Sequence, residues 1–318
     1  MLSTVKELRS RIVPVLKASA IPTATYQRVH AAFSAKLLPV LAGPRALDAL
    51  KAYAQVATAG RLSVLQVTTA LAEAGDVFGR VDAARSRFVP HAAGLIDVVL
   101  AAQESDGLIL VVLDGANRGA TESYLLPLLR SALRRTTPVS LFHPSAISPN
   151  DPYAACSRIV WPENVLLAAT LVEGPTTLPV APDIWADSVF IATDGGETVQ
   201  AASTAAASTE VSEIDPKSML LTLGKGVELT SGGALDGTVK SQALQDAGGR
   251  FERALTAFQS DPTALQAEVV RAVLVPFVAS ISDDEDRAGA ISDIEKNLGS
   301  KASAGFQHAI DTARRSIA

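Results

Sequence analysis

Cysteine is almost absent from this sequence: Cys156 stands alone. A single cysteine excludes an intrachain disulfide and fits a reducing compartment, and no motif around Cys156 indicates a nucleophile. No apolar run approaches the roughly 18 residues of a transmembrane helix. The first 17 residues carry charges every few positions and lack the unbroken apolar segment of a signal peptide. We therefore expect a cytoplasmic protein that makes no contact with membranes.

Positive charge is also in short supply. The chain has 28 Lys and Arg against 33 Asp and Glu, a net charge of −5. Strong nucleic-acid binders usually show a basic excess, so we expect no direct, tight nucleic-acid binding. No G-x-S-x-G nucleophile elbow occurs. The histidines are scattered without the spacing of metal ligands, and they are His30, His91, His143 and His308. These residues predict no metal and no cofactor.

What the chain does have is apolar content, 48% of its 318 residues, with only 5% aromatics. Apolar runs alternate with helical patterns, which is typical of an α/β fold with a parallel sheet and helices on both faces. The predicted strands lie at 37–44, 62–68, 108–114, 163–174 and 187–193. We expect N-terminal helices over 1–36, the α/β core over 37–195, a linker or hairpin insertion over 196–245 and a lid-like helical domain over 246–318.

One stretch carries most of the functional information. The apolar run Leu108–Leu113 ends on Asp114, and Asn117 and Arg118 precede a helical pattern in which Pro127 predicts a kink or a shortened first turn. Asp114-Gly115-Ala116-Asn117-Arg118 resembles the Asp-Glu-x-Asn-Arg element of AAA+ ATPases of the McrB-like and MoxR-like group. Asp76-Val77-Phe78-Gly79 and Arg87-Phe88 echo further elements of that group. The resemblance covers about residues 35 to 195 and implies a phosphate-loop core.

The sequence departs from the family at each catalytic position. The family's phosphate loop, G-x-x-x-x-G-K-[ST], wraps phosphates with backbone N–H groups and a lysine. Here Gly43-Pro44-Arg45 is followed by no second glycine and no Lys-Ser/Thr pair, and Lys51 lies too far along. The family's water-polarising Glu is replaced by Gly115, and its sensor Asn by Val172. The segment 183–188, which would carry an arginine finger, has no Arg.

These losses predict a catalytically inactive pseudo-ATPase, with no catalytic residues. We call the positions that still match the nucleotide-site remnants: Gly43, Lys51, Asp114, Asn117, Arg118 and Thr170. The expected role is a structural or adaptor subunit of a bacterial protein assembly, in defence or in remodelling, bound to a protein partner or to itself. Apolar side chains are expected to supply exposed interface area: Ala46, Leu47, Ala49, Leu50, Val269, Val270, Val273, Leu274 and Phe277.

Two alternatives stay open. A divergent NTPase would bind phosphates with Lys51 or Arg45 and Mg²⁺ with Asp114. A binding module would hold nucleotide without turnover.

Three further features have structural interpretations. Gly224-Lys225-Gly226 is expected to form a hairpin turn, the run 283–286 to cap a helix, and the tryptophans Trp161 and Trp185 to anchor a core or an interface.

Overall fold

A computed structural model describes residues 15, 21–134, 137–193, 241–281, 283–297 and 306–317. Most of the N-terminal region expected to be helical lies outside the described residues, and so do most of the expected 196–245 insertion and the Gly224–Gly226 turn. The proposed domain boundaries therefore stay a prediction.

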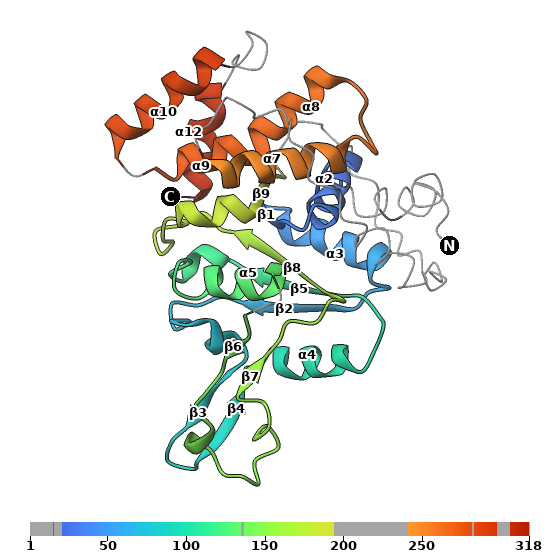
Figure 1. Ribbon diagram of the computed structural model, residues 1–318, viewed down its shortest axis with the longest axis vertical. Coiled ribbons are helices and arrows are strands. Elements are labelled where there is room, and N and C mark those ends of the chain that lie inside the picture. Colours follow the sequence, from blue (N-terminus) through green and yellow to red (C-terminus); the bar gives the residue numbers. More distant parts are fainter. Residues whose placement is uncertain are drawn as a thin grey trace.

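The centre of the molecule is a five-stranded parallel sheet with the strand order β2-β5-β8-β1-β9 (Figure 1). The three inner strands are almost wholly buried, because apolar layers cover both faces of a parallel sheet. The edge strand β2 is buried only at alternate positions. The strands span Leu62–Gln66 (β2), Ile109–Asp114 (β5), Val165–Leu171 (β8), Leu38–Ala42 (β1) and Ser188–Ala192 (β9). The predicted α/β fold is confirmed.

Helices lie on both faces of this sheet. From β1 the chain crosses to β2 at one edge through α3 (Ala46–Ala57), and the later connections run back in the opposite direction. Right-handed crossovers therefore place α3 on one face and α4 (Leu95–Gln103) and α5 (Leu125–Arg134) on the other. Helix α2 (Thr23–Ser34) contacts α3, β1 and β9. Pro127 is the third residue of α5, where its missing N–H removes no helical bond, so the helix begins late rather than kinking.

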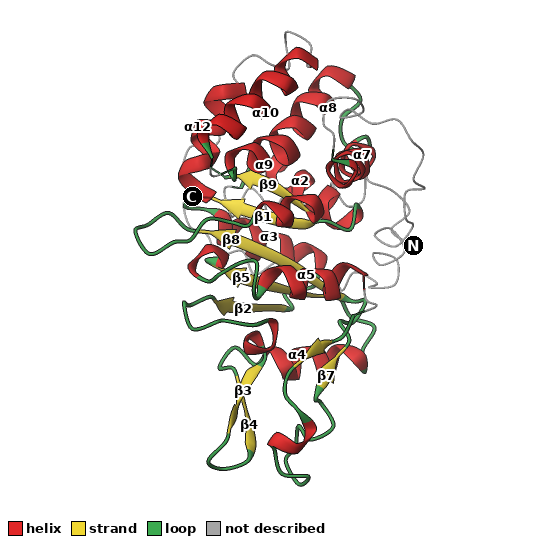
Figure 2. Cartoon of the chain, turned by 60° about the vertical axis from the view of Figure 1, so that its left-hand side comes forward, coloured by secondary structure: helices red, strands yellow, loops and turns green. Residues whose placement is uncertain are grey.

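A pair of small antiparallel sheets extends beyond β2. Strands β3 (Gly79–Asp82) and β4 (Arg87–Pro90) form a hairpin that follows the short helix η1 (Ala74–Val77). Strand β6 (Val139–Ser140) pairs with β7 (Arg158–Ile159). The β3–β4 hairpin projects away from the main sheet in both views (Figures 1 and 2).

The C-terminal region is helical and packs over the β9 edge of the sheet (Figure 2). A π-helical turn, η5 (Val270–Leu274), joins α8 (Pro262–Val269) to α9 (Val275–Ala279). Pro276 follows this turn and cannot donate to the i−4 carbonyl, which accounts for the irregular helix there. The remaining helices are α7 (Gln242–Leu255), α10 (Asp284–Asn297) and α12 (Phe306–Ile317). Among the described helices, none has both the length and the apolar character needed to span a bilayer.

The expectation of exposed apolar interface area on α3 and the C-terminal helices is wrong. Helix α7 packs on α2, η5 packs on β9, and α12 packs on α9, so these apolar faces cover one another and the sheet edge. Leu47 and Phe277 are half-buried against the same core. The rest of the expected set is buried: Ala46, Ala49, Leu50, Val269, Val270, Val273 and Leu274.

Two of the structural interpretations are confirmed. The indoles of Trp161 and Trp185 are fully buried, and Trp161 Nε1 donates to the Val165 carbonyl at 2.9 Å. The acidic run begins α10, where the Asp283 carboxylate accepts the Asp286 N–H at 2.8 Å and acids fill the first turn.

Candidate functional site

The carboxyl ends of the parallel strands form the candidate site, because open α/β sheets bind ligands at that edge. Strand β8 lies between β5 and β1, and its register sets Thr170 beside Leu41. The same register sets Ala169 beside Leu113, so Asp114 lies next to Thr170. The fold therefore brings Gly43, Asp114 and Thr170 to one edge.

The connection at the end of β1 is too short to wrap a phosphate. Only Gly43, Pro44 and Arg45 separate the strand from α3. Gly43 takes a φ of 108°, a left-handed conformation that favours glycine, and its carbonyl accepts the Ala46 N–H at 3.1 Å. A phosphate loop needs several consecutive N–H groups curled around the anion. This tight turn closes directly into the helix instead.

The N-terminus of α3 already has an anion of its own. Asp48 lies in the first turn, where a carboxylate complements the positive end of the helix dipole. Lys51 lies one turn further on, is 51% exposed, and its Nζ is 3.9 Å from the Asp48 carboxylate. Of the nucleotide-site remnants, Lys51 thus has its ammonium group near the exposed carboxylate of Asp48 on the same helix.

The end of β1 is also tied to the end of β9. The Ala42 carbonyl accepts both the backbone N–H of Thr193 at 2.9 Å and its hydroxyl at 2.8 Å. These two bonds fix the strand end from which the Gly43 turn begins.

Asp114 and Thr170 are bonded to each other. The buried Thr170 hydroxyl donates to Asp114 Oδ1 at 2.6 Å and accepts the Gly115 N–H at 2.9 Å. Both hydrogen-bonding directions of this hydroxyl are used within the chain. Asp114 and Thr170 are two of the nucleotide-site remnants. Here they fasten the end of β5 to β8.

Gly115 stands where the resembled family has its second carboxylate, and the backbone conformation at this position favours glycine. Gly115 has a φ of 71° and begins the 3₁₀ turn η2 (Ala116–Arg118). A glutamate would be strained in this left-handed conformation. A Cβ at position 115 would also come within 3.3 Å of the Arg118 side chain. Arg118 itself is exposed at the end of the turn.

Asn117 makes the most complete contact of the remnants. Its side chain is fully buried, its Nδ2 donates to the Val172 carbonyl at 2.8 Å, and its Oδ1 accepts the Val172 N–H at 3.0 Å. Its own carbonyl accepts the Leu178 N–H at 2.7 Å. Three hydrogen bonds thus join η2 to the segment after β8. The sequence placed Asn117 in the motif but gave no sign of this pairing.

The residues after η2 also hold neighbouring segments together through hydrogen bonds. Burial raises the pKa of the Tyr124 phenol, which stays protonated and donates to the Ala116 carbonyl at 2.6 Å. The buried Thr121 hydroxyl accepts the Ala181 N–H at 3.0 Å. The first bond ties the residues before α5 back to η2, and the second joins the same stretch to Ala181. In the described ranges, no three His, Cys, Asp or Glu side chains gather as metal ligands.

Comparison with known proteins leaves the family open. No protein-family model matches the chain, and no curated protein matches it. A crystal structure described as a "putative ATPase" from Cytophaga hutchinsonii is similar at 13% sequence identity and a TM-score of 0.42, over 98% of this chain and 95% of that one.

Proposed function

We propose that this chain is an AAA+-like pseudo-ATPase, a structural or adaptor subunit of a bacterial protein assembly, and that it neither binds nor hydrolyses nucleotide. The observation that carries the proposal is the three-residue turn Gly43–Arg45 where a phosphate loop would be needed. The internal bonding of Asp114, Thr170 and Asn117 supports it. The McrB-like and MoxR-like group, and with it a role in defence or remodelling, belongs to the proposal.

A thermal-shift titration with Mg²⁺-ATP and Mg²⁺-GTP tests binding. A ligand at about 100 times its Kd would stabilise the native state by roughly 2.7 kcal/mol. We expect no shift up to millimolar nucleotide. A shift without phosphate release would favour the module that holds nucleotide without turnover. A shift with release would favour the divergent NTPase.

The same proposal assigns the carboxyl edge of the sheet to protein contact. The segment after β8 carries Leu178, which is 42% exposed although it is a large apolar residue. Arg118 is exposed nearby on η2, whose Asn117 carbonyl binds the Leu178 N–H. In the resembled family this edge faces the neighbouring subunit. Leu178 is therefore the side chain we expect to enter a partner surface.

Sedimentation velocity of the purified chain, alone and with the products of adjacent genes, tests this contact. Leu178→Asp should dissociate the complex. Val160→Asp is the matched control, because Val160 is 51% exposed beside β7 and away from the strand ends. A chain that stays monomeric with every neighbour, or a complex equally sensitive to both variants, would overturn the assignment.

A further inference from the structure

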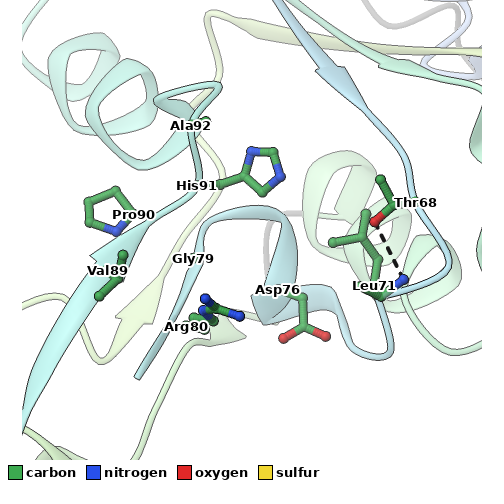
Figure 3. A pocket seen from close by; sticks show the side chains of 10 residues that line it. Thr68, Leu71, Asp76, Gly79, Arg80, Val89, Pro90, His91 and Ala92 are labelled. Carbon is green, nitrogen blue, oxygen red and sulfur yellow. Dashed lines mark hydrogen bonds between the residues drawn. The ribbon is translucent and has the colours of Figure 1, made fainter. Parts of the chain in front are cut away.

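A cavity of about 310 Å³ lies where the β3–β4 hairpin meets the loop that follows β2 (Figure 3). That loop supplies Thr68 and Leu71 on one side, and the end of β4 supplies Val89, Pro90 and His91 on the other. Arg80 and Asp76 border it. Neither the β1 turn nor Asp114 lines this cavity, and the proposed function makes no use of it.

Arg80 is the exposed cation of this cavity. Its backbone pairs with Val89 in the hairpin, but its guanidinium forms no hydrogen bond or ion pair with the residues that the structure describes. Its cross-strand neighbour is the apolar Val89. A guanidinium that is held at a cavity rim without a partner presents its donors to an incoming carboxylate.

His91 offers a second donor. Its Nδ1 accepts the Ala93 N–H at 3.2 Å, so in the neutral ring the proton is on Nε2. The neighbouring acid, Asp76, is already engaged: its Oδ2 accepts the N–H groups of Ala72 at 2.8 Å and Glu73 at 2.9 Å. The two donors therefore face a site whose own carboxylate has its charge compensated by backbone amides.

Positive charge continues along the hairpin. Residues 79–90 contain three arginines and one acid, in a chain whose net charge is −5. Arg85 Nη1 is 3.0 Å from the Asp82 carboxylate, and Arg87 is the cross-strand neighbour of Asp82. This single carboxylate thus pairs with Arg85 and has Arg87 opposite it in the ladder, so the hairpin keeps a positive excess. A second cavity, lined by these side chains, shares Arg80 and Val89 with the first.

The backbone of the hairpin favours a peptide over other anions. His91 N–H donates to the Phe78 carbonyl, and in an antiparallel ladder the groups of Gly79 and Val81 then point away from β4. Strand β4 is occupied on its other side, where Phe88 N–H donates to the Asp151 carboxylate. The open edge of β3 can therefore pair with an extended segment. The aromatic ring of the hairpin, Phe88, is buried and so offers no stacking surface to a nucleic acid.

We propose that this hairpin binds an acidic, extended segment of a partner protein, with one side-chain carboxylate held by Arg80 and His91 and further acids beside Arg85 and Arg87. The inference rests on the proposed function only in that the segment belongs to a partner. The hairpin site does not involve nucleotide, so the peptide-binding proposal and the pseudo-ATPase proposal can each fail without the other.

Fluorescence anisotropy with fluorescein-labelled hexaglutamate tests the site on the full chain, and labelled hexaglutamine is the neutral probe. We expect hexaglutamate to bind, hexaglutamine not to bind, and salt to weaken the complex. Arg80→Gln should raise the Kd about tenfold or more, because a charge-assisted bond is lost. His91→Asn keeps an acceptor for the Ala93 N–H and removes the Nε2 donor, so it should weaken binding several-fold.

Arg271→Gln is the matched control, since Arg271 is 60% exposed on η5, far from the hairpin in sequence. It should leave the Kd unchanged. The thermal midpoint of Arg80→Gln should equal that of the parent, because the guanidinium has no hydrogen bond or ion pair to lose within the described residues. The proposal is overturned by absent hexaglutamate binding at low salt, or by equal effects of Arg80→Gln and Arg271→Gln. Tighter, Arg80-dependent binding of an oligothymidylate would instead make the hairpin a nucleic-acid site.

Discussion

Replacing Asn117 by Ala removes a two-bond connection at the carboxyl edge of the sheet. Both Val172 backbone groups lose their partner at once, the N–H from a 3.0 Å bond and the carbonyl from a 2.8 Å bond. An unsatisfied buried backbone group costs about 1–3 kcal/mol. Because these bonds are only partly buried, water can replace some of the loss, and we expect a destabilisation of roughly 2–4 kcal/mol.

Urea unfolding followed by circular dichroism measures this change in the free energy of unfolding. Arg118→Ala is the control at the next position. Its side chain is exposed, and surface substitutions usually stay within about 0.5 kcal/mol. An Asn117→Ala variant as stable as the parent would refute the view that Asn117 is kept to join β8 to η2. Equal losses of stability in Asn117→Ala and Arg118→Ala would also refute that view.

Three more changes test other parts of the account. Leu113→Ala empties a fully buried position of β5 and should cost roughly 2–5 kcal/mol by urea unfolding; a parent-like value would place Leu113 outside the core. Thr170→Val removes the hydroxyl that joins Asp114 to Gly115 and should cost about 1–3 kcal/mol, measured the same way, whereas a neutral result would remove its structural role. Burial lowers the pKa of His30 to about 4. The unfolded chain therefore binds more protons between about pH 6.5 and 4, so stability should fall as the pH falls through that window, and His30→Gln should reduce this slope.

The sheet could be predicted from the sequence because its strands are continuous apolar runs. Leu108–Leu113 and the run over 163–174 have no alternation, as expected for strands covered on both faces. They became β5 and β8 with small changes at their ends. The strand-to-helix turn at Gly43 was also readable, since the missing glycine and lysine already excluded a phosphate loop.

The β3–β4 hairpin and the packing of the C-terminal helices could not be predicted from apolar runs in the sequence. Strands β3 and β4 have four residues each, too few for a clear period, and their alignment depends on Gly79, where a Cβ would come within 2.4 Å of the Val89 carbonyl. Val273 and Leu274 were predicted to be exposed because the sequence alone does not show which helices and strands pack against them. The pairing of Asn117 with Val172 joins positions 55 residues apart, a contact that only the three-dimensional fold reveals.

Phosphate release from Mg²⁺-ATP and Mg²⁺-GTP by the purified full chain, measured beside its Asp114→Asn variant, tests the central claim most directly. We expect release at the protein-free background for both, because the Gly43–Arg45 turn offers no phosphate cradle and Gly115 stands where the resembled family has its water-polarising Glu. Any trace activity should be the same in the variant. Steady turnover that Asp114→Asn abolishes would contradict the account and identify a divergent, working NTPase.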